Sequence, residues 1–328
     1  MDQLDFKIFR TLGLRPSGNQ RGDSNRLNPW VIAKKLGVDG NTVKLRLAKM
    51  KKSGFIRYFQ IYPNYRLLGI GGGSAYLFEL DDPERKNAII SQCALVDGVT
   101  EITSFVGSEV CIDFTYHDPK DESRRLTLLL GLTNCKRAEK FYDRIMPPVR
   151  FELSNTDWRI IKSLRYNAFK PLSKVAQELG LSTKTVRRRF QRMVDNKSVV
   201  IVPAIQPGDV PNTITHVLLL YFKESQREQA LIKALHLFED KYFLIDTTSE
   251  GNAMLGLVAQ TLAETEENFI SSRKIEGVRN VKMLILKETQ DFSQWLDQEI
   301  ETKIAETSKL LRADVDIVTY KYKLNESD

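Results

Sequence analysis

Two stretches of this chain are variants of one pattern. Residues 36–50, LGVDGNTVKLRLAKM, align without a gap with residues 179–193, LGLSTKTVRRRFQRM, at a shift of 143 positions, and six of the fifteen positions are identical. Upstream, residues 4–12 match residues 156–164. A repeat of about 150 residues is too long for a solenoid unit. The sequence therefore predicts a module that occurs twice in 328 residues.

Each copy begins with helical periodicity. In the second copy we expect helices at 156–165, 171–179 and 183–195, with Ser182 as an N-cap and Gly180 as a helix stop. An alternating segment follows in each copy, 55–63 and 199–207, and predicts a short two-stranded wing. This order is that of a winged helix-turn-helix.

The remainder of each copy alternates strands and helices. The order strand, helix, strand, strand, helix, strand predicts a small antiparallel sheet with helices on one face, so the fold class is α+β. We place the strands at 74–80, 99–105, 110–116 and 148–153 and at 215–223, 243–249, 253–259 and 280–287, with helices near 83–94, 121–145, 225–238 and 262–275. The expected domains are a winged helix-turn-helix at 1–66, a βαββαβ domain at 67–153, a second winged helix-turn-helix at 154–208, a second βαββαβ domain at 209–289 and an extension at 290–328.

Two segments lie outside the repeated pattern. The polar insertion at 15–26 predicts a mobile loop in the first copy. The extension predicts a helix with an apolar side and then a strand at 316–324. It is interpreted as a packing element or an oligomer contact. The residues on its apolar side are Trp295, Leu296, Ile300, Ile304 and Leu311.

Positive charge is concentrated in the two helical regions. Residues 28–66 carry nine Lys or Arg against one acid, and residues 156–201 carry eleven against three, a net charge of +8 in each window. Because the whole chain carries +7, the remainder carries −9. Two basic windows in an acidic remainder indicate a polyanionic partner, and double-stranded DNA fits a helix-turn-helix. The windows lack the bulky apolar face of a membrane-surface helix.

The third helix of each copy has an inner and an outer face. Val186, Phe190 and Met193 fall on one side of the helix and predict its core face. The outer positions predict a DNA-reading surface, with a merely solvated face as the alternative. The candidate DNA-binding residues are Asn41, Thr42, Lys44, Arg46, Lys49 and Lys52 in the first copy and Lys184, Thr185, Arg187, Arg188, Arg189, Gln191 and Arg192 in the second.

Nothing in the sequence predicts a catalytic residue, a metal site or a cofactor. The three cysteines have no C-x-x-C spacing, which favours free thiols in a reducing, cytoplasmic location. The three histidines occur in no catalytic motif. The glycines of 69–78 lead into a strand and favour a hinge over a phosphate loop. No apolar run is long enough to span a membrane.

The order of elements resembles the Lrp/AsnC, or feast/famine, transcription regulators. The matching residues are 4–13, 32–56 and 61–70, followed by the sheet domain. The resemblance implies oligomer contacts through the sheets, here within one chain or between chains, and a possible small-molecule effector. Candidate effector-binding residues in the loops between the second and third strands are Gly107, Ser108, Glu109, Gly251 and Asn252.

Two other classes remain open. Siroheme decarboxylases also resemble a pair of Lrp-like modules, and a fused pair would have this outline. A protein-binding scaffold built on winged helices is the third class. The two basic windows favour DNA binding, because an enzyme acting on a tetrapyrrole does not need positive charge on those helices.

Overall fold

The computed structural model describes residues 1–12, 29–144, 147–149, 151–248 and 251–325, with side chains up to residue 309 except Asp209. The insertion at 15–26 lies outside the described residues. The α-helices are α1 (Gln3–Thr11), α2 (Pro29–Leu36), α3 (Gly40–Lys52), α4 (Lys86–Cys93), α5 (Pro119–Thr133), α6 (Asn155–Leu164), α7 (Leu172–Leu179), α8 (Thr183–Asp195), α9 (Arg227–Leu237), α10 (Leu262–Arg273) and α11 (Gln294–Asn325). The strands are β1 (Ile56–Pro63), β2 (Gly72–Glu79), β3 (Val99–Phe105), β4 (Glu109–Tyr116), β5 (Glu139–Arg144), β6 (Val199–Ile205), β7 (Ile214–Phe222), β8 (Tyr242–Thr247), β9 (Ala253–Ala259) and β10 (Val278–Asp291).

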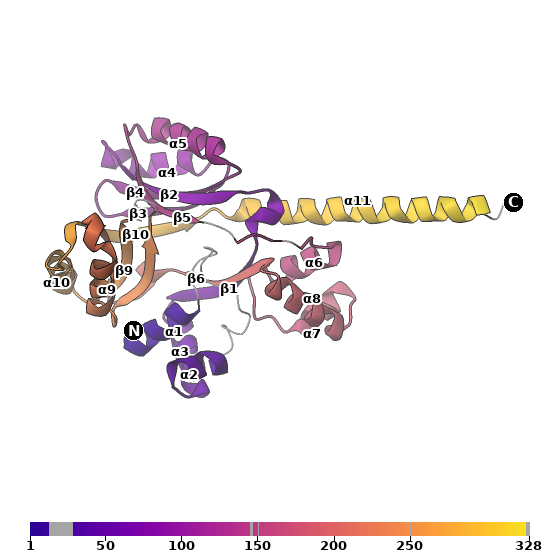
Figure 1. Ribbon diagram of the computed structural model, residues 1–328, viewed down its shortest axis with the longest axis horizontal. Coiled ribbons are helices and arrows are strands. Elements are labelled where there is room, and N and C mark those ends of the chain that lie inside the picture. The colour runs from indigo at the N-terminus through magenta and orange to yellow at the C-terminus, as the bar shows by residue number, and fades with distance from the viewer. Residues whose placement is uncertain (13–28, 145–146, 150, 249–250, 326–328) are drawn as a thin grey trace.

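One antiparallel sheet of eight strands forms the centre of the molecule (Figure 1). Its order is β5-β2-β4-β3-β10-β7-β9-β8. The long strand β10 joins the two halves, because its first part pairs with β7 and its last part, 286–291, pairs with β3. The sheet is curved, since the outer strands β5 and β8 also approach each other.

Each half of the sheet is covered by helices on one face. Helices α4 and α5 pack on the β2 to β4 half, and α9 and α10 pack on the β7 to β10 half (Figure 1). On the opposite face, side chains of both halves form one apolar cluster, including Phe105, Phe141 and Met254. Strand β4 is buried on both faces, which is consistent with the apolar run at 110–112, although the buried Asp113 and Thr115 follow that run.

Strands β1 and β6 form a two-stranded ribbon with each other, with Ile61 opposite Ile201. The prediction of a separate two-stranded wing in each copy is therefore wrong. The 55–63 and 199–207 segments do form strands, but each finds its partner in the other half of the chain. Strand β1 also reaches the second helical unit, because Ile61 N donates to Arg165 O at 3.0 Å and Ala168 N donates to Phe59 O at 2.8 Å.

The two helical units, α1–α3 (the first head) and α6–α8 (the second head), are held by different elements. In the first head, Arg10 Nη1 donates to Tyr242 O at 2.6 Å and Phe9 packs near Phe243, which ties α1 to β8. The second head contacts α11 (Figure 1). There Arg165 Nε pairs with Asp297 at 3.0 Å, and Leu296 and Ile300 are fully buried in the shared core.

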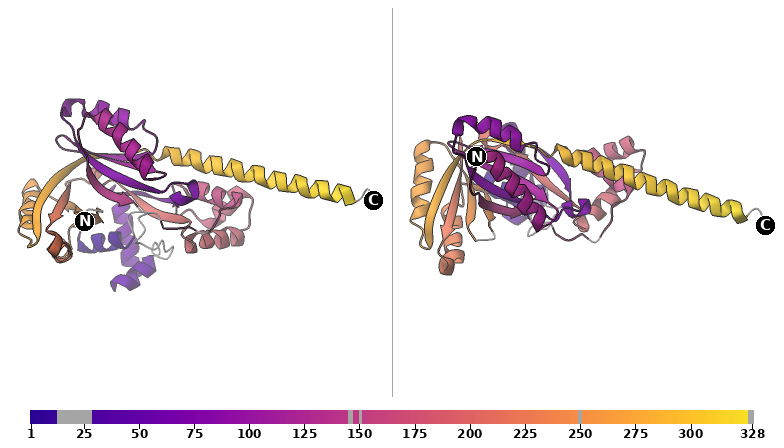
Figure 2. Two further views of the ribbon diagram at one scale, coloured as in Figure 1. Left: turned by 45° about the horizontal axis from the view of Figure 1, so that its top comes forward. Right: turned by 90° about the horizontal axis from the view of Figure 1, so that it is seen from above.

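Helix α11 continues well beyond this contact. It has 32 residues, a length of about 48 Å, and its far end projects away from the rest of the protein in every view (Figures 1 and 2). The strand expected at 316–324 is therefore wrong, because those residues continue the helix. The apolar side expected for this segment is confirmed for Trp295, Leu296, Ile300 and Ile304, all packed in the core, while the side chain of Leu311 lies outside the described residues.

The last strand of the first half is also displaced from its expected position. It was expected at 148–153 after a helix extending to 145, but α5 ends at Thr133 and β5 covers 139–144. Asn134 ends the helix, because it adopts the left-handed conformation with φ of 56°. The residues described between 147 and 153 form neither helix nor strand.

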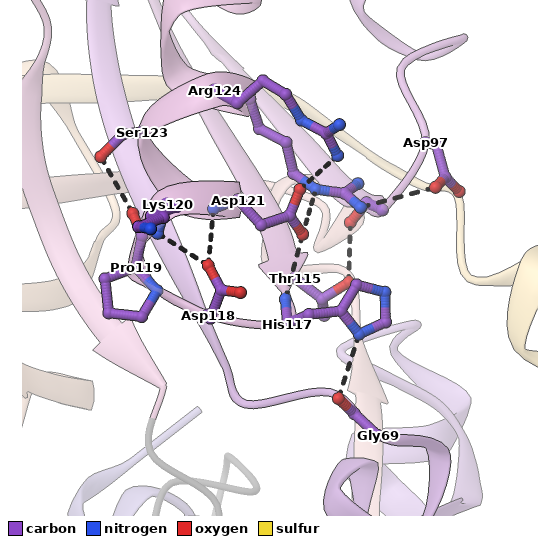
Figure 3. A network of polar contacts seen from close by, with 12 residues as sticks. Gly69, Asp97, Thr115, His117, Asp118, Pro119, Lys120, Asp121, Ser123 and Arg124 are labelled. Atoms are coloured by element: carbon purple, nitrogen blue, oxygen red, sulfur yellow. Dashed lines mark hydrogen bonds and ion pairs between the residues drawn. The ribbon is translucent and has the colours of Figure 1, made fainter.

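A network of polar contacts fixes the start of α5 against neighbouring loops (Figure 3). Asp121 Oδ2 accepts hydrogen bonds from His117 N and Arg125 Nε, both at 3.0 Å, and its other oxygen pairs with Arg124. His117 Nδ1 lies 3.0 Å from Gly69 O, which links the network to the entry of β2. The charge of Asp121 therefore stabilises the junction between α5 and the sheet.

Acid should destabilise the protein partly through Asp121. Burial alone would raise the pKa of this carboxyl, but the bonds from His117, Arg124 and Arg125 lower its pKa to about 2, from an ordinary value of 3.8. The stabilisation is thus complete above pH 4 and is lost as the pH falls towards 2, a change of about 2 kcal/mol. The free energy of unfolding, measured in urea between pH 2 and pH 6, should fall less steeply with decreasing pH in Asp121→Asn than in the parent protein. Asp97→Asn is the matched control, because Asp97 contacts the same network but its side chain is 93% exposed. An unchanged acid slope in Asp121→Asn would contradict the assignment.

Candidate nucleic-acid interface

Helix α8 begins and ends where its sequence dictates. The Ser182 hydroxyl accepts a hydrogen bond from Thr185 N at 3.1 Å, and Gly180 ends the preceding helix with φ of 66°. The predicted core face is confirmed for Val186 and Met193, which are fully buried, and Phe190 packs partly buried against the same core. Helix α8 is therefore held by its apolar side with the other side in solvent.

The solvent side of α8 collects four cations. Lys184, Arg187, Arg188 and Arg192 are all exposed, and they span two turns of the helix. Among the residues that the structure describes, Arg188 has no hydrogen bond or ion pair. Like charges held on one exposed helix face repel each other, so an anion that approaches this face gains favourable interactions with several of them.

Three of the candidate residues on α8, Thr185, Gln191 and Arg192, make contacts within the protein. Gln191 Nε2 donates to Asp195 Oδ1 at 2.8 Å, and the guanidinium of Arg192 lies 4.0 Å from the centre of the Phe151 ring. The Thr185 hydroxyl lies 2.9 Å from that of Ser182. Arg192 keeps its charge at the surface in a fixed position, whereas Gln191 must leave Asp195 before it can reach a base.

Helix α3 follows the same plan with as many exposed cations, Lys44, Lys49, Lys51 and Lys52. Val43 and Met50 are buried and Leu47 is partly buried. On the outside, Asn41, Lys44, Lys49 and Lys52 are exposed and Thr42 is half-buried. Lys49 Nζ lies 3.8 Å from Asp5, so part of its charge is balanced by α1.

Arg46 and Arg189 occupy equivalent positions and make equivalent ion pairs. Arg46 Nη1 bonds to Asp2 and, at 3.2 Å, to Asp5, while Arg189 Nη1 bonds to Asp157 at 3.1 Å. The side chains of Asp5 and Asp157 are 0% and 4% exposed. Both arginines thus fix the third helix of a head onto its first helix, beside the core face, and their contact with DNA stays a prediction.

The two heads differ at the centre of the exposed face. Leu45 of α3, 71% exposed, stands where α8 has Arg188, and Ala48 stands where α8 has Gln191. Trp30 at the start of α2 is 60% exposed. The first head therefore presents apolar groups where the second presents groups that can hydrogen-bond to base edges.

The candidate effector residues lie in tight turns between strands. Lys86 Nζ donates to Gly107 O at 2.9 Å, and Glu109 pairs with Lys282 at 3.1 Å across to β10. Gly251 N and Asn252 N donate to Thr248, and the backbone of Ser108 accepts from Leu80 N at 3.1 Å. These contacts are those of well-formed turns, and the effector role of the five residues stays a prediction.

Among the described part of the chain, no group of three His, Cys, Asp or Glu side chains has a geometry that could hold a metal ion. His216 is fully buried, and burial lowers its pKa to about 4, so the ring is neutral at neutral pH. No helix within the described ranges is both long and apolar enough to cross a membrane.

The fold of the whole chain is similar to that of a solved enzyme. The crystal structure of the siroheme decarboxylase NirDL covers 93% of this chain and 99% of its own, with a TM-score of 0.51 and 12% identity. A second NirDL structure, in complex with an iron-uroporphyrin III analogue, gives the same score at 13% identity. At this identity the likeness concerns the fold alone.

Sequence comparisons give a more specific result. The model of the AsnC-type helix-turn-helix domain matches residues 153–194, the second head. The HTH-type transcriptional regulator Ptr1 of Methanocaldococcus jannaschii is 32% identical over 103 residues, which are 31% of this chain and 69% of that protein. An uncharacterised HTH-type transcriptional regulator of Pyrococcus abyssi is 32% identical over 110 residues, 33% of this chain and 67% of that protein. This chain therefore belongs to the Lrp/AsnC family of helix-turn-helix transcription regulators.

Proposed function

We propose that this protein is a cytoplasmic regulator that binds double-stranded DNA with a sequence preference, chiefly through α8. The observation that carries the proposal is the exposed row of Lys184, Arg187, Arg188 and Arg192 on a helix whose opposite side is buried. A helix held in this way can enter the major groove, where its middle meets base edges and its flanks meet phosphates.

The two heads have unequal parts in this proposal. Helix α8 supplies four exposed cations, one of them the central Arg188, whereas α3 supplies Lys44, Lys49, Lys51 and Lys52 around the apolar Leu45. We assign sequence choice to the second head and phosphate contacts to the first. Because β1 and β6 form one ribbon, the two heads meet DNA as a connected pair within one chain.

Salt dependence tests the proposal directly. Each phosphate neutralised contributes roughly −0.9 to the slope of log affinity against log salt concentration, so binding by α8 alone should give about −4 and binding by both heads about −6. Fluorescence anisotropy with a duplex selected from a random pool would measure the slope. An affinity that does not change with salt, or no selected duplex at all, would contradict DNA binding.

The enzymatic alternative rests on the fold shared with NirDL. We propose that this chain acts by binding and not by catalysis, because the pocket between its ribbon and its sheet has a volume of about 240 Å³, below the range usual for sites that enclose a large ligand. Incubation with siroheme under reducing conditions, followed by mass spectrometry, tests this: a product lighter by one or two carbon dioxide units would establish the enzyme instead.

A further inference from the structure

The described contacts of α11 with the second head lie in the first part of that helix. Asn155 Nδ2 of α6 donates to Ile304 O and to Ser308 Oγ, both at 2.8 Å. The projecting segment (residues 310–325) then carries the helix about 24 Å further, away from the rest of the protein (Figures 1 and 2). Residues 315–322 are mostly β-branched or aromatic, and such residues have a low helix propensity. The segment therefore needs a packing partner to remain helical.

Apolar residues recur in the projecting segment with the period of a coiled coil. Leu310, Ile317 and Leu324 are seven positions apart. Ala313 and Tyr320 follow the first two of them by three positions. These are the a and d positions of a heptad repeat, which lie on one side of a helix. Because the corresponding positions one heptad earlier are charged, the apolar stripe begins where the described contacts with the second head end.

The charges of the projecting segment do not suit a polyanion. The segment carries three cations against two acids, a net charge of +1: Arg312, Lys321 and Lys323 against Asp314 and Asp316. A segment that follows a phosphate backbone needs an excess of cations. Charges of both signs in near balance beside an apolar stripe are typical of a helix that pairs with another helix.

The flanking charges select a second copy of the same helix. In a parallel pair of helices, each g position faces the next e position of the other helix. Lys309, at a g position, then faces Asp314 of the second copy, and Asp316, at the next g position, faces Lys321. Two-fold symmetry makes each of these pairs occur on both sides of the seam. The helix is therefore complementary to itself in this arrangement.

An antiparallel pair lacks this combination. In the register that brings opposite flanking charges together, Leu324 of one copy is level with Glu306 of the other. In the register that aligns the apolar stripes over most of their length, Asp316 meets Asp316 and Lys321 meets Lys321. The parallel pair alone joins apolar layers at all three a positions to attractive flanks.

A second apolar stripe, at 311, 315, 318 and 322, has a different neighbour. It repeats, at intervals of one heptad, the positions of Ile304 and Ser308, which contact α6. The stripe thus continues the side of α11 that packs on the second head. With this stripe as the seam, the flanking charges would lose their partners, since Asp314 would face Thr319. The stripe from Leu310 to Leu324 is therefore the one that fits a second copy.

We propose that the projecting segments of two copies form a parallel two-stranded coiled coil. Its seam consists of the a and d positions from Leu310 to Leu324, and the flanking charges set its orientation. The pair then joins two heads from each chain. If the chain binds DNA as proposed above, binding of one site makes contact with a second site on the same DNA intramolecular. This consequence rests on the proposed function, whereas the pairing itself does not.

Sedimentation velocity of the whole chain, over about 1 to 100 μM, tests the pairing. The unaltered protein should change from monomer to dimer over this range. Ile317→Asp places a charge in the seam and should raise the dissociation constant at least about tenfold. Val318→Asp is the matched control, because it places the same charge one position outside the seam, and it should change the constant by less than about twofold. A chain that stays monomeric throughout, no effect of Ile317→Asp, or equal losses in the two variants would overturn the proposal.

Charge reversal tests the orientation. Asp316→Lys and Lys321→Asp each create like-charged pairs in the parallel dimer and should weaken it about fivefold. The double variant restores opposite charges and should recover the parent dissociation constant within about twofold. A double variant that is weaker than either single variant would overturn the parallel arrangement. None of these measurements needs DNA, so a dimer that binds no duplex would contradict the proposed function and leave the pairing intact.

Discussion

Replacing Asp157 by alanine is expected to lower the free energy of unfolding of the second head by about 3 kcal/mol. The Asp157 carboxylate is 4% exposed and accepts from Arg189 Nη1 at 3.1 Å, from Ser154 N at 3.0 Å and from the Ser154 hydroxyl at 2.6 Å. The variant removes a capping box, worth about 1 kcal/mol, and leaves the half-buried Arg189 without its carboxylate, worth about 2 kcal/mol more. Urea unfolding monitored by Trp158, which is buried in α6, measures the change.

The control for this substitution is Asp195→Ala. Asp195 is also an aspartate in the second head, but it is exposed, and among the described residues its side chain bonds to Gln191 of the same helix alone. Its replacement should change the free energy of unfolding by about 0.5 kcal/mol or less. Equal effects of the two substitutions would show that the Asp157–Arg189 pair does not hold α8 on α6.

Replacing Arg188 by alanine is expected to weaken binding to the preferred duplex by about 1–3 kcal/mol and to relax the preference at one base step. Arg188 is exposed near the middle of α8, opposite the buried Val186 and Met193. Arg192 lies against Phe151 nearer the end of the helix, where we expect a backbone phosphate rather than a base. Arg192→Ala should therefore weaken matched and scrambled duplexes equally and reduce the salt slope by about 0.9.

The first head offers a matched control for Arg188. Leu45 has the equivalent position in α3 and is 71% exposed, so Leu45→Ala removes a side chain from the same place without removing a hydrogen-bond donor. Competition between matched and scrambled duplexes should show no change for Leu45→Ala. If Arg188→Ala and Arg192→Ala both bind like the parent protein, the arginines of α8 are only a solvated surface.

Local signals in the sequence were sufficient to predict the helices of the two heads. The caps at Ser182 and Gly180 and the spacing of Val186 and Met193 act within one helix or its neighbour, and the structure places them as the pattern predicts. The same holds for most strands, since alternation and turn residues are local. The predicted helix ran to residue 145, beyond the C-cap at Asn134, because the residues after Asn134 do not interrupt the helical pattern. The prediction of a strand at 316–324 was wrong because a run of β-branched and aromatic residues is compatible with a helix as well as with a strand.

Pairing between distant segments could not be predicted in the same way. The sequence of residues 56–63 does not specify that they pair with 199–205 instead of with a strand nearby in the chain, because edge strands of similar composition can pair equally well. The pocket between the ribbon and the sheet was missed for a related reason, as its lining comes from strands far apart in the sequence. One signal was present: Asp113 interrupts the apolar run of β4, and a carboxylate inside a buried strand needs partners. The ion pairs of Arg46 with Asp5 and of Arg189 with Asp157 likewise depend on how α1 packs against α3 and α6 against α8, which a helical pattern alone does not specify.

The ribbon shared by β1 and β6 has a consequence for how such a protein works at low abundance. Two separate chains that pair their heads come apart on dilution, so the fraction of active protein depends on how many copies a cell contains. Here both strands belong to one polypeptide, so their association does not change with concentration. Each half is also free to mutate independently, which two identical subunits are not. The two heads can therefore recognise a DNA site whose halves differ, because the second head presents Arg188 where the first presents Leu45.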